Sequence, residues 1–305
     1  MKLPLPPPGC RRLSPLGVAL GVFVTLGFTL GLLGGPFLRS LLQVQRVMPN
    51  DSFYFSIVRD PGTLGESAFS YFRAAAPAFR NSPSLDAFLA SPSRFFRPGV
   101  RGNHYARNLQ WFDFGLPEPK NSQEIPAMLE ALERVFPLVL LAESFDESLV
   151  LLRHRLCWPP DAVDLFPHNS RGSSRQVSPA QMRRLRAWNS LDWALYSHFN
   201  RSFWRQAERF GLRRLRREVA EIRQRRRALA AKCLRGGGPV PAQAIPDGNL
   251  RPFQPPGGGK ILGFALKEGL GAEERELCGR LAMPELPYKD LLERRQFGPK
   301  NGTAA

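Results

Sequence analysis

FYFSIVRDPGTLGESAFSYF, residues 53–72, is the stretch of sequence that decides the fold of this chain. It begins with an apolar run of aromatic and β-branched residues, which is typical of a buried strand. Residues 60–62, DPG, then break the strand. Thr63 and Glu66 have capping-box spacing, so we expect a helix to begin at Thr63. The stretch therefore predicts a strand, a tight turn and a helix.

Two polar side chains of this stretch lie where ligands bind in α/β proteins. Arg59 follows the last residue of the predicted strand, and Ser67 lies in the first turns of the predicted helix. In open α/β sheets, ligands bind at the carboxyl ends of the strands. A guanidinium, a hydroxyl and the free N–H groups of a helix N-terminus together suit a phosphate. The alternative is that Arg59 is a surface arginine after an ordinary strand.

A strand followed by a helix recurs further along the chain. Residues 138–142, LVLLA, are fully apolar and predict a second buried parallel strand. An amphipathic helix over 125–135 precedes it, and a helix over 145–156 follows it. This repetition predicts an α/β fold. Glu143 either is a functional carboxylate near the site or caps the following helix.

Composition limits the classes of partner. The 305 residues have room for one large domain or two small ones, and an apolar fraction of 43% is enough for a packed core. The formal charge of +17 comes almost entirely from arginine, which favours bidentate contact with phosphate, sulfate and carboxylate. No zinc-finger, homeodomain or RNA-recognition motif is present, so we expect an anionic nucleotide or anionic glycans rather than nucleic acid. No spacing resembles a zinc site, and we expect no metal.

An uncharged segment near the N-terminus predicts a membrane anchor. Residues 13–38 are long enough to cross a bilayer, and Arg11 and Arg12 before them place the N-terminus in the cytosol. The alternative is a cleaved signal peptide, but the apolar stretch is longer than a normal signal. The predicted organisation is a cytosolic tail over 1–12, a signal anchor over 13–38, a stem over 39–52, a lumenal domain over 53–298 and a disordered tail over 299–305.

Glycosylation signals and cysteines are compatible with this topology. Triplets that fit N-x-S/T begin at Asn50, Asn200 and Asn301, although Asn200 lies inside a predicted helix. With Cys10 in the cytosol, three cysteines face a compartment that permits disulfides. We pair Cys233, at the end of a long helix, with Cys278 in a later one. Cys157 is then either a buried thiol or a cysteine whose partner is absent from the chain.

Residues 102–115, GNHYARNLQWFDFG, are the candidate acceptor-binding segment, because aromatic rings beside hydrogen-bonding side chains suit a sugar. The candidate residues are Arg107, Asn108, Trp111 and Asp113. The alternative is a buried aromatic turn whose polar groups are satisfied. His104 and Glu143 are candidate catalytic bases.

Two further segments carry open interpretations. Residues 213–227 are dense in arginine, which indicates either a solvated helix face or attraction of sulfated or sialylated glycans. Residues 257–260, GGGK, are similar to a phosphate loop but lack the Ser or Thr that should follow.

A long helical region is predicted to begin at Ser178. Its apolar residues recur at helical spacing and form a core stripe, which consists of Leu185, Trp188, Leu191, Leu195, Phe199 and Phe203.

Longer motifs resemble the galactose 3-O-sulfotransferases, in particular the fourth member of that family. The similarity runs from about residue 16 to about residue 297. The motifs are SIVRDP, SAFSYF, HYARNLQWFDFGLP, LVLLAESFDESLVLL, LCW, RAWNSLDWALYSHFNRSFW and PELPYKD. These motifs are long and specific.

The resemblance implies a type II Golgi membrane protein with a lumenal α/β domain of the P-loop-like sulfotransferase fold. It implies that Arg59 and Ser67 bind the 3′-phosphate of 3′-phosphoadenosine 5′-phosphosulfate (PAPS), the sulfate donor. The implied reaction transfers sulfate to the 3-hydroxyl of a terminal β-galactose on glycoproteins or glycolipids, with O-glycan cores expected first. The sequence leaves the oligomeric state open, a homo-oligomer included.

The chain departs from the family pattern before residue 53. Family members carry there a first strand and a loop whose lysine, glycine and Ser/Thr residues surround the 5′-phosphosulfate. Here no lysine lies between Lys2 and Lys120, and no Gly-rich loop precedes Phe53. We expect an internal deletion, as exon skipping would produce, and an incomplete parallel sheet. The alternative function is a catalytically inactive splice-type variant that acts, if at all, as a glycan- or partner-binding membrane protein.

Overall fold

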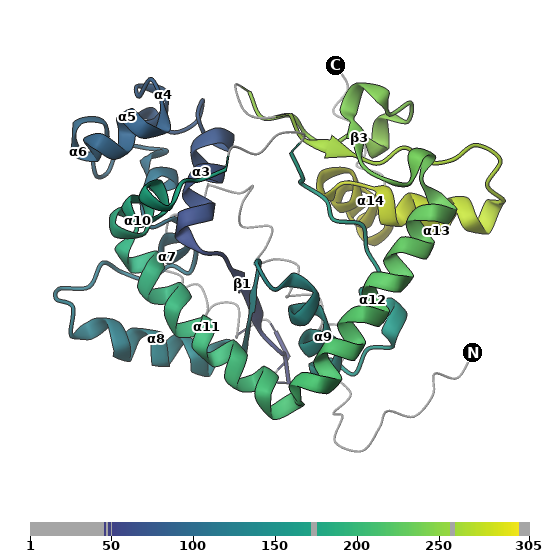
Figure 1. Cartoon of the computed structure of the whole chain (residues 1–305), viewed down its shortest axis with the longest axis horizontal. Helices are drawn as coiled ribbons and strands as arrows, with labels where there is room; N and C mark the ends of the chain where they lie inside the picture. Colours follow the sequence, from purple (N-terminus) through teal and green to yellow (C-terminus); the bar gives the residue numbers. More distant parts are fainter. Residues whose placement is uncertain (1–45, 47, 50, 172–175, 257–259, 299–305) are drawn as a thin grey trace. The chain divides into compact units, whose positions relative to one another are not determined.

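The computed structural model describes residues 46, 48–49, 51–171, 176–256 and 260–298 (Figure 1). The chain divides into two compact units. The first contains Met1–Val163 and Val177–Ala220, and the second contains Asp164–Gln176 and Glu221–Ala305. The predicted lumenal domain over 53–298 thus extends across both units.

A parallel pair of strands lies at the centre of the first unit (Figure 1). Strand β1 (Phe55–Val58) pairs with β2 (Leu138–Leu141), with Phe55 opposite Leu138 and Val58 opposite Leu141. Ala142 extends the pairing by donating its N–H to the carbonyl of Val58 at 2.9 Å. The chain is therefore an α/β protein with a small parallel sheet, as the strand–helix repetition predicts.

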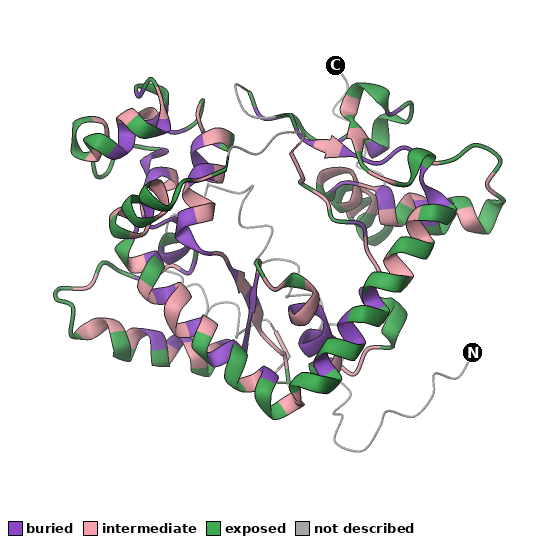
Figure 2. Cartoon of the chain, viewed as in Figure 1, coloured by how far each residue is buried: buried purple, intermediate pink, exposed green. Residues whose placement is uncertain are grey.

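Strand β1 is less buried than the sequence predicts. Its residues alternate between half-buried and buried, whereas all four residues of β2 are buried (Figure 2). In the described part of the chain, β2 is the only strand that pairs with β1. The aromatic run from Phe53 is apolar enough for a central strand, but only one edge of β1 is occupied.

Helix α3 (Pro61–Tyr71) begins two residues earlier than predicted. Asp60 is its N-cap and accepts the N–H of Gly62, while Pro61 stands at the first helical position. A proline there loses no helical hydrogen bond and its φ already suits a helix. The capping box predicted for Thr63 and Glu66 was therefore wrong, because the DPG sequence starts the helix instead of only breaking the strand.

The other described elements of the first unit are helices (Figure 1). They are α4 (Pro77–Arg80), α5 (Leu85–Ala90), α6 (Pro92–Phe95), η1 (Asn103–Ala106), α7 (Leu109–Asp113), α8 (Glu124–Val135), α9 (Phe145–Arg155), η2 (Pro160–Val163), α10 (Pro179–Trp188), α11 (Ser190–Phe210) and the first part of α12 (Leu212–Cys233). Ser178 caps α10 in a capping box with Gln181, so the start predicted there is confirmed. In the predicted core stripe, Leu185, Leu195, Phe199 and Phe203 are buried.

The second unit has its own hydrophobic core, which a disulfide cross-links. An antiparallel pair joins β3 (Val240–Pro241) and β4 (Leu262–Gly263). The other elements are the end of α12, η3 (Arg235–Gly237), η4 (Ala242–Ala244), η5 (Gly248–Leu250), α13 (Ala272–Ala282) and α14 (Glu285–Phe297). Cys233 and Cys278 form a disulfide within this core, as predicted. Cys157 is also disulfide-bonded, so neither reading of it as a leftover cysteine holds.

Several predictions concern residues outside the described part of the chain. The signal anchor over 13–38, the sites Asn50 and Asn301, and most of the GGGK segment lie there. Among the described residues, no helix combines the length and the apolar character that a bilayer crossing needs.

Candidate functional site

Arg59 lies directly after β1, and its backbone is held by one buried side chain. Gln110 of α7 accepts the N–H of Arg59 through Oε1 at 2.6 Å and donates from Nε2 to the carbonyl of Arg59 at 2.8 Å. Gln110 is only 8% exposed. A side-chain amide that makes both hydrogen bonds fixes the position of the residue at the carboxyl end of the strand.

The side chain of Arg59 keeps most of its donors available. Its Nε donates to Oγ1 of Thr63 at 3.1 Å, and no other hydrogen bond or ion pair engages its guanidinium among the described residues. Ser67 lies one helical turn beyond Thr63, so the two hydroxyls share a face of α3. The Ser67 hydroxyl likewise has no partner in the described part of the chain. The free guanidinium N–H groups and this hydroxyl are the phosphate-binding groups that the sequence predicts.

The N-terminus of α3 does not contribute the free N–H groups that we expected. The Gly62 N–H donates to the Asp60 side chain at 2.8 Å, and the Thr63 and Leu64 N–H groups donate to the Asp60 carbonyl. The expectation of a helix-terminus anion site is wrong because Asp60 already accepts from these donors, through its carboxylate and its backbone carbonyl. An anion here depends on side chains alone.

A network of charged groups surrounds the Asp60 turn. Arg186 of α10 forms an ion pair with Asp60, with one contact from Nε at 3.0 Å, and its guanidinium stacks over Trp193 at 4.4 Å. The hydrogen bond to Asp60 raises the pKa of Arg186. Burial, together with the charges of Glu143 and Asp60, raises the pKa of Tyr196 to about 12. Tyr196 therefore stays protonated at neutral pH and donates its hydroxyl hydrogen to the carboxylate of Glu143.

Glu143 belongs to this network, and its contacts exclude the interpretation that it caps the following helix. Its Oε1 accepts the N–H of Asp60 at 2.9 Å and the hydroxyl of Thr63 at 3.2 Å. Ser144, rather than Glu143, occupies the N-cap position of α9. Glu143 therefore lies beside Arg59 at the edge of the sheet and does not cap the following helix.

Two of the predicted acceptor-binding residues have structural roles. Asn108 is buried; its N–H donates to Asn189 Oδ1 at 2.8 Å, and its own Oδ1 accepts the N–H of Leu191 at 3.2 Å. Trp111 is 2% exposed, and its indole N–H donates to the carbonyl of Pro117 at 3.1 Å. The Asn108 contacts tie the start of α7 to the start of α11, and the Trp111 contact ties α7 to the loop after it, so the alternative of a buried, satisfied turn describes these two residues.

The other candidate residues, Arg107, Asp113 and His104, are at least partly accessible. Arg107 is half-buried, and its guanidinium lies 4.9 Å from the Trp188 ring. Asp113 is exposed. His104 stacks on Phe112 with ring centroids 4.5 Å apart, and partial burial lowers its pKa, so the imidazole is neutral at neutral pH. Its ring nitrogens have no hydrogen-bond partner among the described residues.

Sequence reasoning missed Gln110, Arg186 and Tyr196. Each lies on a helix far along the chain from Arg59. All three stand inside the family motifs HYARNLQWFDFGLP and RAWNSLDWALYSHFNRSFW, but nothing in these motifs connects them with Arg59. Asn200, a predicted glycosylation site, is half-buried within α11. The described residues contain no group of His, Cys, Asp or Glu that could hold a metal ion.

The first unit is therefore an α/β protein with a small parallel sheet, and among the described residues Arg59 has unengaged donors at the carboxyl end of β1 beside a helix hydroxyl. A family model described as Galactose-3-O-sulfotransferase matches residues 37–296. The chain belongs to the galactose-3-O-sulfotransferase family.

Curated relatives support this assignment. Galactose-3-O-sulfotransferase 4 of Bos taurus is 43% identical over 331 residues, covering 85% of this chain and 68% of the relative. Galactose-3-O-sulfotransferase 2 of Homo sapiens is 49% identical over 268 residues, covering 86% and 67%. Galactosylceramide sulfotransferase of Mus musculus is 42% identical over 254 residues, covering 81% and 60%. No solved structure matches the chain.

Gln110 makes two hydrogen bonds to the backbone of Arg59, which we call the Gln110 clamp. Its contribution can be measured as a change in the stability of the protein. Gln110→Ala removes two hydrogen bonds and leaves the backbone groups of Arg59 without their partner. We expect the free energy of unfolding to fall by about 1–3 kcal/mol in denaturant titrations. Gln123→Ala is the matched control, because Gln123 is exposed and its side chain caps nothing. Equal stabilities for the two variants would contradict the clamp.

Proposed function

We propose that this chain binds the 3′-phosphate of PAPS through Arg59 and Ser67. The observation that carries the proposal is the clamped position of Arg59 at the carboxyl end of β1, with its terminal guanidinium N–H groups free. Two N–H groups of one guanidinium can contact two oxygens of a phosphate, and a hydroxyl can donate to a third. The side chains present therefore fit a phosphate monoester.

The charges around Arg59 favour a single phosphate rather than a polyphosphate. Asp60 is neutralised by Arg186, and Glu143 accepts hydrogen bonds from the Asp60 N–H and from Thr63. Arg59 is the cation in this network that lacks an acidic partner among the described residues. It supplies the positive charge that a 3′-phosphate needs, whereas the 5′-phosphosulfate needs further groups.

The reaction proposed is transfer of sulfate from PAPS to the 3-hydroxyl of a terminal β-galactose, first on O-glycan cores. Arg107 and Asp113 are the accessible candidates for binding the sugar. Of the two candidate bases, His104 suits the role better, because its neutral ring has an available nitrogen that can accept the hydroxyl proton. Glu143 is already engaged by two donors.

Calorimetric titration tests the nucleotide part of the proposal. Adenosine 3′,5′-bisphosphate should bind the purified chain more tightly than 5′-AMP, because only the bisphosphate carries the 3′-phosphate. Equal affinities for the two nucleotides, or no heat from either, would overturn the assignment.

A second candidate function is binding without transfer, and one observation favours it. The chain has no lysine between Lys2 and Lys120 and no Gly-rich loop before Phe53. The residues that hold the 5′-phosphosulfate in the family are therefore not found at their expected place. Such a chain would be an inactive variant that binds nucleotide, glycan or another protein in the membrane.

We also propose a single-pass type II topology in the Golgi membrane. Arg11 and Arg12 precede the uncharged segment over 13–38, which favours a cytosolic N-terminus and a lumenal C-terminus. Glycosidase treatment of the expressed protein should therefore shift its mobility on a gel. No shift, combined with cleavage of the C-terminus by protease added to intact vesicles, would contradict this topology.

A further inference from the structure

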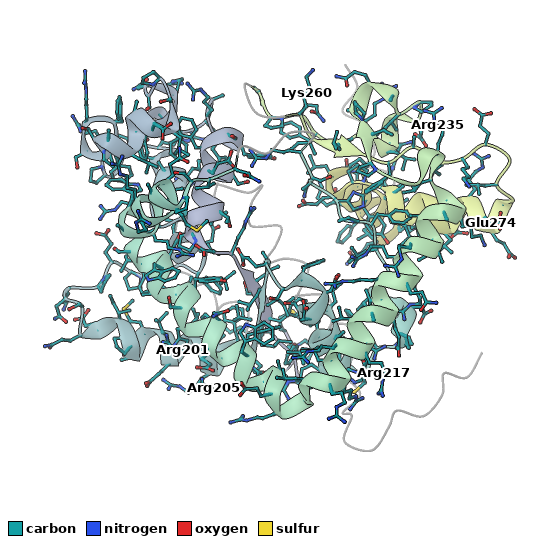
Figure 3. All side chains as sticks on the ribbon, in the orientation of Figure 1. Arg201, Arg205, Arg217, Arg235, Lys260 and Glu274 are labelled. Atoms are coloured by element: carbon teal, nitrogen blue, oxygen red, sulfur yellow. A yellow bond between two sulfur atoms is a disulfide. The ribbon has the colours of Figure 1, made fainter. Side chains whose placement is uncertain are left out.

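Three arginines lie at four-residue spacing on α11, and two more lie at four-residue spacing at the start of α12, after the break at Gly211. They are Arg201, Arg205, Arg209, Arg213 and Arg217, and we call them the arginine stripe. All five are exposed. Figure 3 labels Arg201 and Arg205 on α11 and Arg217 on α12, all three on the outside of the ribbon. The whole stripe belongs to the first unit.

The fold explains why these arginines face solvent. Phe199, Phe203 and Ala207 turn the opposite side of α11 toward the core, and Leu215 and Val219 do the same for α12. Because residues four apart lie on one helix face, each set of arginines is displayed away from the core. Successive members on one helix are separated by a rise of about 6 Å.

The stripe is almost free of acidic partners. Arg205 lies 3.6 Å from Glu133, and the other four arginines make no ion pair among the described residues. Glu208 is the one acidic residue on the same face of α11, and it too makes no ion pair there. Like charges at four-residue spacing destabilise a helix, so this face has charge that an anionic partner would neutralise.

The residue types indicate the chemistry of the partner. Arginine binds sulfate and carboxylate groups bidentately, whereas lysine binds as a point charge, and all five positions are arginine. Trp204 borders the stripe and is 36% exposed, which offers a flat aromatic surface to a sugar ring. We propose that the arginine stripe is a docking surface for anionic glycans that carry sulfate or carboxylate groups.

This surface is separate from the proposed nucleotide site. The contacts around Arg59 come from α3, α7, α10 and the first turns of α11, and the stripe begins beyond Tyr196. Glycan docking on the stripe would hold a branched or multiply charged acceptor near the protein without touching the reacting groups. If Arg59 and Ser67 did not bind the nucleotide, the proposed docking of glycans on the arginine stripe would be unaffected.

The test uses the full chain purified in detergent and a fluorescent chondroitin sulfate hexasaccharide as the probe. One variant replaces all five stripe arginines with glutamine. The matched control replaces five other exposed arginines of the first unit with glutamine, which are Arg80, Arg101, Arg155, Arg183 and Arg184. Both variants lose five positive charges, so a difference between them reports position and not net charge.

We expect the stripe variant to bind the hexasaccharide at least tenfold more weakly than the unchanged chain, and the control variant to stay within threefold. The salt dependence of binding should also be smaller in the stripe variant. Circular dichroism and the affinity for adenosine 3′,5′-bisphosphate should be the same in all three proteins. These two measurements separate loss of the surface from loss of the fold.

Three outcomes would overturn the proposal. Equal losses in the two variants would show that net charge alone attracts the glycan. Equally tight binding of single-stranded DNA with the same number of charges would show a surface for any polyanion. Binding to phosphatidylserine vesicles without binding to the hexasaccharide would show a membrane-facing surface instead.

Discussion

Incubated with radiolabelled PAPS and a terminal β-galactoside, the purified chain should transfer sulfate at a rate near background. Removing one preorganised donor to a developing charge typically lowers the rate of an enzyme about a hundredfold to a thousandfold. The family resemblance implies that a lysine, loop amides and a neighbouring base hold the 5′-phosphosulfate, and this chain has no lysine between Lys2 and Lys120 and no Gly-rich loop before Phe53. We therefore expect a rate at least about a thousandfold below that of an active family member.

The structure gives a second reason for this expectation. Within the described residues, β1 pairs with β2 alone, so its other edge has no neighbouring strand. Unpaired backbone groups and a half-exposed aromatic strand lower stability and favour association. Poor folding and retention early in the secretory pathway should accompany the low rate. The control is galactose-3-O-sulfotransferase 2 prepared in the same way, and a comparable rate for the two proteins would show that another segment supplies the 5′-phosphosulfate site.

The second large effect should appear in nucleotide binding. Arg59→Ala removes the charged donors proposed for the 3′-phosphate, and hydrogen bonds to charged groups contribute about 1.5–3 kcal/mol each. Affinity for adenosine 3′,5′-bisphosphate should therefore fall by about tenfold to a hundredfold or more, as measured by calorimetry. Ser67→Ala should have a smaller effect of a few fold, because it removes a neutral hydroxyl. The two groups together should contribute on the order of 2–5 kcal/mol.

Two control variants make this result specific. Arg80→Ala removes an exposed arginine of the same unit and should leave the affinity unchanged. Arg59→Lys keeps the charge but loses the planar fork, so its affinity should be intermediate. Among the described residues, the only side-chain hydrogen bond that Arg59→Ala removes is the one from Nε to Oγ1 of Thr63, so the protein should still unfold cooperatively. An unchanged affinity in folded Arg59→Ala would mean that the phosphate binds elsewhere.

Local sequence signals predicted the elements of the first unit well. The apolar run LVLLA became β2, and Ser178 with Pro179 began α10, because these signals act within a few residues. The DPG sequence has two local roles. It breaks the strand, and its Asp N-cap and its Pro at the first helical position also start a helix.

In the candidate acceptor-binding segment, residues 102–115, local sequence patterns do not reveal which side chains are buried. Its polar and aromatic residues are the same whether they face a sugar or a protein core. Asn108 and Trp111 are buried because Asn189, Leu191 and Pro117 supply their hydrogen-bond partners. Two of these partners lie more than eighty positions away along the chain, so no spacing within the segment could indicate them.

The sequence by itself determined the α/β class, the family, the position of Arg59 after a strand and the pairing of Cys233 with Cys278. These properties follow from short-range patterns and from motifs long enough to be specific. Only the tertiary structure decided that Gln110 clamps Arg59, that Asp60 occupies the N–H groups of α3, and that Glu143 joins this network. The physical reason is that hydrogen bonds and ion pairs form between groups that folding brings together, and their separation in sequence does not reveal which groups will meet.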